Sequence, residues 1–220
     1  MNKIVINVVK GFIMKTKIFL SVLFLLAFGL ERGIAQDTLP DIIWSVEFEN
    51  NLIPYDAKFS PDGTIIAHGM NEGLFQIRNV EDGALLKQFD HGHGTSRITN
   101  IEFSPDGKFL FTGSNERNFV RMWDLSADTI YKTFFSDNKP YDMKRVYSMD
   151  VNLSGDKISA IILDEAGNRY LFVWDIETSE IVKKIMYGQL GNQILKFSAN
   201  GQYLAVTEDE CINLYDANTF

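Results

Sequence analysis

A short turn motif recurs four times along this 220-residue chain and sets the spacing of the segments between its copies. It reads Phe-Ser-Pro-Asp-Gly at residues 59–63 and 103–107, and it returns in degraded form at 151–155 and 197–201. The closing glycines are 44, 48 and 46 residues apart, at Gly63, Gly107, Gly155 and Gly201. A period of this length indicates a repeated unit of four strands, stacked so that neighbouring units share their apolar faces.

The motif has the chemistry of a chain reversal. Proline presets φ at the first corner, the aspartate can bond back to the backbone, and glycine takes positive φ. A first strand is therefore predicted before each turn, at 55–59, 98–103, 146–151 and 193–197. A second strand is predicted after each turn, at 64–68, 108–113, 157–163 and 202–207.

Two further strands complete the repeat. The third ends in an aromatic–acidic pair or a relative of one, at 78–79, 123–124, 174–175 and 215–216. A fourth closes the first three repeats, at 84–89, 129–135 and 180–186. Residues 43–49 alternate apolar and polar side chains and predict one more strand, which would complete the last unit of a closed ring. Because no strong helical period follows residue 35, the chain is expected to be all-β.

The pairs Trp123-Asp124 and Trp174-Asp175, the Gly92-His93 pair and the four turns resemble a WD-repeat β-propeller over residues 43–220. The resemblance implies four-stranded antiparallel blades, with repeats near 50–90, 91–136, 137–187 and 188–220. Seven blades of this length need about 300 residues. We therefore expect an N-terminal fragment whose fourth repeat is truncated and whose remaining blades follow Phe220. A four-blade ring, or pairing with another chain, is the alternative.

The resemblance also implies a buried polar chain within a blade. Only the second repeat comes close to it, with glutamate in place of the usual aspartate: His93, Thr112 or Ser114, Glu116 and Trp123. The blades are therefore expected to depend mainly on apolar packing. Structural roles are predicted for the strand-end pairs Trp123, Asp124, Trp174, Asp175, Tyr215 and Asp216, and for the turn residues Asp62, Gly63, Asp106, Gly107, Gly155 and Gly201.

Residues 1–35 predict a secretory signal peptide. Lys15 and Lys17 precede an uncharged apolar run at 18–30, and the small-residue pattern at 33–35 follows as a cleavage site. Met14 is the better start, because it places the lysines directly before the run. The run is shorter than the ~20 residues that span a bilayer. We expect residues 36–220 to be exported to the periplasm or the cell exterior, with a membrane anchor as the alternative.

Charge and cysteine content narrow the classes of partner. Residues 36–220 carry 16 basic and 28 acidic groups, a net of −12, which argues against nucleic acid and anionic membranes. The single cysteine, Cys211, excludes a disulfide within the chain, and we expect it to be a small buried residue on a strand.

The sequence offers little support for catalysis or metal binding. His91 and His93 lack a third ligand at matching spacing, and the Asp-rich turns lack the ligand spacing of a calcium loop. Gly-x-Ser-x-Gly, His-Glu-x-x-His and P-loop motifs do not occur. We therefore predict no metal, no cofactor and no catalytic residue.

Binding is the remaining class. Arg97 and Arg145 align just before the first strands of adjacent repeats and predict an anion or carboxylate contact, although solvated loop charges are the alternative. Tyr141, in the long connection before the third repeat, is a further candidate contact. The sequence predicts a non-catalytic protein-interaction scaffold. A propeller enzyme of hydrolase, lactonase or glycosidase type, or a propeller that binds a small ligand or carbohydrate, is the competing interpretation, with its site in missing blades or an appended domain.

Overall fold

The computed structural model describes residues 41–92, 96–116, 119–135, 143–164, 166–187, 194–208 and 210–220. The chain divides into two units, Met1–Asp41 and Ile42–Phe220. The predicted signal peptide lies outside the described residues, so the fold below is that of the second unit. Within the described residues, no helix is long and apolar enough to cross a membrane.

Fifteen strands among the described residues form four antiparallel sheets, and each sheet uses strands that follow one another in the chain. The first sheet contains β1 (Pro54–Phe59), β2 (Ile65–Met70), β3 (Leu74–Asn79) and β4 (Leu85–Asp90). The second contains β5 (Ile98–Phe103), β6 (Phe109–Ser114), β7 (Phe119–Asp124) and β8 (Thr129–Phe135). The third contains β9 (Met143–Val151), β10 (Lys157–Asp164), β11 (Arg169–Asp175) and β12 (Ile181–Tyr187). The fourth contains β13 (Leu195–Phe197), β14 (Tyr203–Glu208) and β15 (Cys211–Asp216).

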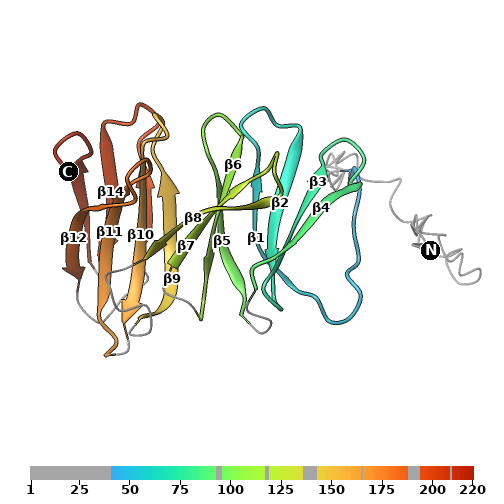
Figure 1. Cartoon of the computed structure of the whole chain (residues 1–220), viewed down its shortest axis with the longest axis horizontal. Coiled ribbons are helices and arrows are strands. Elements are labelled where there is room, and N and C mark those ends of the chain that lie inside the picture. The colour runs from blue at the N-terminus through green and yellow to red at the C-terminus, as the bar shows by residue number, and fades with distance from the viewer. Residues whose placement is uncertain are drawn as a thin grey trace, which may run out of the picture. The chain divides into compact units, whose positions relative to one another are not determined.

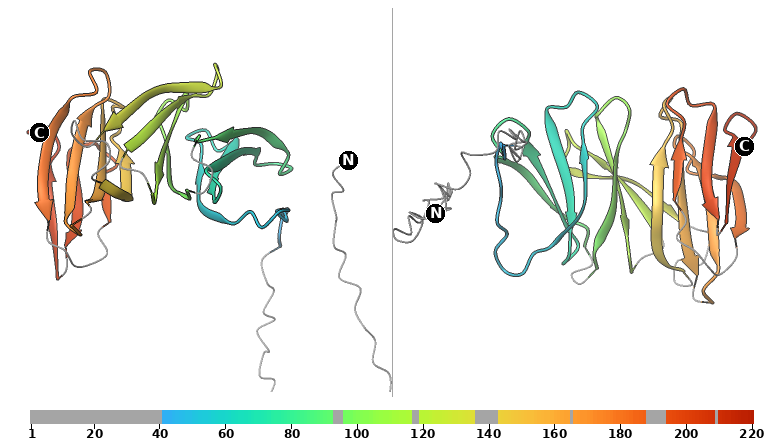
Figure 2. Two further views of the ribbon diagram at one scale, coloured as in Figure 1. Left: turned by 60° about the horizontal axis from the view of Figure 1, so that its bottom comes forward. Right: turned by 180° about the vertical axis from the view of Figure 1, so that it is seen from behind.

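The predicted fold class is confirmed, because all four sheets are antiparallel, three of them are four-stranded, and they are arranged like propeller blades. Figures 1 and 2 show them side by side in chain order. Strand β9 begins three residues earlier than predicted, at Met143. Strands β2 and β6 begin one residue later, because the backbone N–H groups of Thr64 and Lys108 donate to the turn aspartates instead of to a neighbouring strand.

Neighbouring sheets share three apolar clusters. Trp123 of the second sheet packs edge-on against Phe75 of the first, with ring centres 4.9 Å apart. Trp174 of the third sheet packs against Phe134 of the second, at 6.2 Å. Leu204 and Val206 of the fourth sheet pack with Leu171 and Val173 of the third. Most of the stabilisation between sheets therefore comes from burial of apolar side chains.

The inner strands β1, β5, β9 and β13 are also joined by side-chain hydrogen bonds to the neighbouring backbone. These bonds are Asp56 Oδ2 with Ile101 N (2.8 Å), Asn100 Nδ2 with Val146 O (2.9 Å), Ser148 Oγ with Leu195 N (3.2 Å) and Asp150 Oδ2 with Phe197 N (2.6 Å). In each case the side chain belongs to the earlier sheet. The bonds fix the height of one sheet against the next, which apolar packing alone does not determine.

The prediction of a strand at residues 43–49 is wrong. No described ladder includes this segment, although Trp44, Val46 and Phe48 are half-buried and alternate with exposed residues. The alternation instead reflects packing on the first sheet, where the Trp44 indole N–H donates to Val80 O at 2.7 Å and the Phe48 ring lies 5.2 Å from the His68 ring.

The position of Trp44 repeats a contact seen further along the chain. The carbonyl that follows the third strand of the second sheet, Leu125 O, accepts from Lys87 of the first sheet. The matching carbonyl of the third sheet, Ile176 O, accepts from Lys132 of the second sheet at 2.7 Å. Trp44 thus occupies, on the first sheet, the place that an outer-strand lysine takes on the next two.

The fourth sheet has three strands among the described residues, and one of its faces is exposed. Ile212 and Leu214 on β15 are 71% and 64% exposed. Cys211 is exposed at the start of β15, so the expectation that it is buried is wrong. In the second sheet, the third sheet covers the apolar face of β7. Among the described residues, no sheet covers the corresponding face of β15.

Candidate functional site

Two arginines lie over tyrosine rings at the edge where the inner strands begin. The guanidinium carbon of Arg97, next to β5, lies 5.4 Å from the centre of the Tyr55 ring on β1. The guanidinium carbon of Arg145 lies 4.7 Å from the Tyr147 ring on β9. Both arginines are exposed. We call these residues, together with Arg169, the connection edge; the predicted contact Tyr141 lies outside the described residues.

Arg169 is a third arginine of this edge. It is the first residue of β11, and its guanidinium carbon lies 5.0 Å from the same Tyr147 ring. Leu163 pairs with Arg145 on one side and with Arg169 on the other, so both arginines belong to one row across the third sheet. Sequence reasoning missed Arg169, although its place at the start of a third strand indicates this edge.

The two exposed arginines of this edge, Arg97 and Arg145, are suited to binding acceptor groups, whereas Arg169 is buried. A guanidinium over an aromatic face gains about 0.5–1 kcal/mol at an exposed site. A guanidinium also carries its N–H donors in a planar fork that matches a carboxylate. Because stacking already restricts the side chain, less conformational entropy is lost when a partner binds.

The second sheet contains part of the predicted polar chain. The Trp123 indole N–H donates to Thr112 Oγ1 at 2.8 Å, and both residues are buried. Ser114 is also buried, and its Oγ accepts from the backbone N–H of Glu116 at 3.2 Å. The Glu116 side chain is exposed. Contrary to the prediction, it therefore does not take the place of the buried aspartate in the polar chain.

Of the two histidines considered as metal ligands, only His91 lies among the described residues. His93 lies outside the described residues. His91 is buried, and its ring stacks on Phe119 with centres 5.5 Å apart and lies 6.0 Å from the Trp123 ring. Among the described residues, no group of three or more His, Cys, Asp or Glu side chains is placed to hold a metal ion.

The opposite edge is lined by carboxylates that are engaged in their own turns; we call it the turn edge. Ser60 Oγ donates to Asp62 Oδ1 and Ser104 Oγ to Asp106 Oδ1, both at 2.6 Å. These hydroxyl hydrogen bonds are the main reason that the pKa values of Asp62 and Asp106 are lowered. The adjoining glycines all have φ of 71–72°, at Gly63, Gly107, Gly155 and Gly201.

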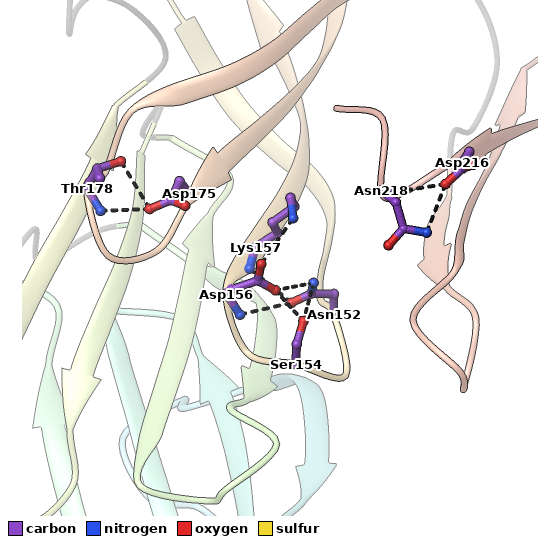
Figure 3. Close-up of polar contacts among 8 residues, drawn as sticks. All are labelled: Asn152, Ser154, Asp156, Lys157, Asp175, Thr178, Asp216 and Asn218. Carbon is purple, nitrogen blue, oxygen red and sulfur yellow. Dashed lines mark hydrogen bonds and ion pairs between the residues drawn. The ribbon is translucent and has the colours of Figure 1, made fainter.

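The aspartates that end the third strands stabilise the next turn rather than a polar chain within the blade. Asp124 accepts from the Ser126 hydroxyl, which is the main cause of its lowered pKa. Asp175 accepts from Thr178 and Asp216 from Asn218, as Figure 3 shows. Trp174 is fully buried, and the Tyr215 hydroxyl contacts that of Tyr187, 2.5 Å away on the third sheet.

A row of charged residues crosses the inner strands, and sequence reasoning missed it. Lys58, Glu102, Asp150 and Lys196 each stand five residues before a turn glycine, which is the signal that could have identified the row. Glu102 pairs with Lys58 at 2.6 Å and with Lys196 at 3.4 Å, and Asp150 pairs with Lys196 at 2.6 Å. Burial raises the pKa of Glu102, although both lysines oppose the rise. Burial lowers the pKa of Lys196, but its hydrogen bond to Asp150 and the charges of Asp150 and Glu102 together outweigh this, so the net shift is upward.

Comparisons with known proteins agree with this architecture. Residues 83–124, which run from β4 to the end of β7, match the family model described as WD domain, G-beta repeat. The chain is 23% identical over 153 residues to WD repeat and SOCS box-containing protein 1 of Danio rerio, covering 64% of this chain and 34% of that protein. It is 25% identical over 167 residues to COMPASS component SWD3 of Saccharomyces cerevisiae, covering 72% of this chain and 49% of that protein.

A solved structure shows the same fold. A chain in the crystal structure of the Mitotic Checkpoint Complex superposes with a TM-score of 0.64 at 17% identity, over 79% of this chain and 50% of that chain. The present chain therefore spans a third to a half of the length of these relatives. Together the matches support the resemblance to WD40-repeat proteins and the propeller-blade fold.

Proposed function

We propose that this chain is the propeller part of an exported, non-catalytic scaffold that binds other proteins. The observation that carries the proposal is the connection edge, where Arg97 and Arg145 lie exposed on tyrosine rings in adjacent sheets. Such an edge presents restrained hydrogen-bond donors to a carboxylate-bearing partner. The names of the matched relatives also place WD repeats within larger proteins or complexes.

Export is part of the proposal. It is supported by Lys15 and Lys17 before the apolar run at 18–30 and by the small residues at 33–35. N-terminal sequencing of the mature protein is expected to begin at Gln36. Recovery of the uncleaved chain from the cytoplasm would contradict this part.

We further propose that another blade covers the open face of the fourth sheet. Ile212 and Leu214 are exposed, whereas Val120 and Met122, at the same places on β7, are 0% and 3% exposed because the third sheet covers them. A coding sequence that continues past Phe220 with another copy of the turn motif supports this proposal. A stop codon there, with a stable monomeric product, contradicts it.

The scaffold proposal is tested with the full chain and fluorescein-labelled decapeptides rich in Glu and Asp. Anisotropy titrations compare the unmodified chain with the double variant Arg97→Glu/Arg145→Glu. The matched control is Lys108→Glu, which reverses an exposed cation on the turn edge. The double variant is expected to bind acidic peptides roughly tenfold more weakly, the loss expected for about 1.4 kcal/mol of ionic contact.

Three results would count against the scaffold. Equal binding of neutral and acidic peptides, or equal losses in the double variant and the Lys108 control, would remove the connection edge as the contact. Turnover of an ester, glycoside or lactone that disappears on Glu102→Gln would favour an enzyme whose site lies on the inner strands.

A further inference from the structure

A cleft of about 600 Å³ opens between the second and third sheets at the turn edge. Its walls include the buried or half-buried side chains of Phe109, Phe111 and Met122. Tyr131 and Leu153 line its mouth and are 53% and 58% exposed. Large apolar side chains that flank a cleft and remain exposed are typical of a contact site.

The cleft lies at the contact where the turn motif is degraded, and Leu153, Ser154 and Gly155 of the third turn line it. The phenylalanine that opens the motif packs into the contact with the preceding sheet in the second and fourth copies, where Phe103 and Phe197 are buried. The third copy has Val151, which packs only partly buried against the cluster between the second and third sheets. This contact therefore lacks an aromatic ring that the contacts on either side contain.

The walls of the cleft suit such a ring. Phe109 and Tyr131 form a tilted aromatic pair with centres 5.1 Å apart. Met122 adds a polarisable thioether, which makes favourable contacts with aromatic edges. An inserted phenyl ring can therefore find both edge-to-face and sulfur–aromatic contacts.

The charged groups of the lining favour a cation beside that ring. Three carboxylates and one ammonium line the cleft, from Asp106, Asp156, Glu177 and Lys132. The Lys132 ammonium donates to the backbone carbonyls of Ile176 and Glu177.

The carboxylates differ in how far they are already paired. Asp106 pairs with Lys108 at 3.5 Å and Asp156 with Lys157 at 3.0 Å. Within the part of the chain that the structure describes, the exposed Glu177 carboxylate makes no ion pair. The position left for a cationic group of a ligand is therefore beside Glu177.

We propose that this cleft binds a short segment of a partner protein that inserts one phenylalanine and places a lysine or arginine against Glu177. The phenyl ring replaces in trans the aromatic residue that the third turn motif has lost. The site lies on the turn edge and is separate from the arginines of the connection edge.

The test uses the full chain and the labelled pentapeptide Gly-Lys-Phe-Lys-Gly, followed by anisotropy. One control peptide carries Ser in place of Phe, and another carries Glu in place of both lysines. Val151→Phe restores the motif residue next to Phe111 and Met122, in the cluster that these two cleft residues share, and is expected to occupy the cleft, while Tyr131→Ser removes one wall. The matched control is Leu86→Ser, because Leu86 holds the same register position on β4 and is also exposed.

The unmodified chain is expected to bind the Phe peptide saturably, with affinity reduced roughly tenfold or more by loss of the phenyl ring, by Val151→Phe and by Tyr131→Ser. Leu86→Ser should leave binding unchanged, and Glu177→Gln should weaken the lysine peptide without weakening a Gly-Ser-Phe-Ser-Gly peptide. Thermal unfolding of each variant identifies any that fails to fold. Binding that survives both Val151→Phe and Tyr131→Ser, or the absence of saturable binding at millimolar peptide, overturns the proposal.

Discussion

Asp150 offers the sharpest test of how the sheets are held together. Its Oδ2 accepts the backbone N–H of Phe197, and its Oδ1 accepts the Lys196 ammonium, both at 2.6 Å. The side chain is 7% exposed, so water cannot readily replace either partner. We predict that Asp150→Ala weakens the contact between the third and fourth sheets more than removal of any exposed carboxylate.

The expected loss follows from the two contacts. A hydrogen bond to a charged group contributes about 1.5–3 kcal/mol, and a buried N–H left without an acceptor retains its desolvation cost. The ion pair adds less than about 1 kcal/mol, because the Lys196 side chain is 58% exposed and keeps Glu102 as a partner. Asp150→Ala should therefore lower the free energy of unfolding by about 3 kcal/mol. Asp150→Asn, which keeps an oxygen acceptor for Phe197, should cost about 1 kcal/mol.

The assay is equilibrium urea unfolding of the full chain, followed by tryptophan fluorescence and far-UV circular dichroism. The control is Asp128→Asn, which removes an exposed partner of Lys87 and should change the free energy by less than about 0.5 kcal/mol. The reasoning is refuted if Asp150→Ala stays within about 0.5 kcal/mol of the unmodified chain. It also fails if the alanine and asparagine variants lose equal stability, because the acceptor for Phe197 would then be irrelevant.

Two further predictions concern close packing and pH. A Cβ at Gly69 would overlap the Ile98 carbonyl oxygen, whereas a Cβ at Gly63, where φ is 72°, meets nothing within 4 Å. In urea unfolding, Gly69→Ala should therefore lower the free energy of unfolding by about 3 kcal/mol and Gly63→Ala by only about 1 kcal/mol. Equal losses would contradict this. Burial, with Arg78 beside the ring, lowers the pKa of His68 from 6.5 to about 4, so the folded chain keeps the ring neutral while the unfolded chain protonates near 6.5. Stability should be full above pH 6.5 and fall by at most about 3 kcal/mol as the pH drops to 4; a pH dependence that His68→Gln leaves unchanged would argue against this assignment.

The repeat period was sufficient to predict the fold class, because turn chemistry and strand alternation act over a few residues. The same reasoning could not predict contacts between sheets. Arg97 meets Tyr55, 42 residues earlier, only because β1 and β5 lie side by side. The segment at 43–49 shows the same limit, since alternation predicts half-burial but does not reveal whether a neighbouring backbone is available for pairing.

The third turn shows why its degraded sequence still forms the same reversal. Ser60 Oγ and Ser104 Oγ accept the backbone N–H five residues later, at 3.1 and 3.0 Å. In the third copy Asn152 Oδ1 accepts from the Lys157 N–H at 2.9 Å, so an amide performs the role of the hydroxyl (Figure 3).

The carboxylate of this turn has moved as well, from before the glycine to Asp156 just after it. Burial opposes ionisation of Asp156, but hydrogen bonds from Ser154 and Asn152 and the charge of Lys157 lower its pKa to about 2. The reversal needs only a glycine with positive φ, an acceptor for one N–H and a second side-chain oxygen within reach, which the fourth copy takes from the Asn200 amide instead of a carboxylate. Val151 and Leu153 lie outside that requirement and are free to differ from Phe and Pro. Substitution at these two positions changes the surface between two sheets without disturbing the turn, which is how a repeated structural element can acquire a binding cleft in one of its copies.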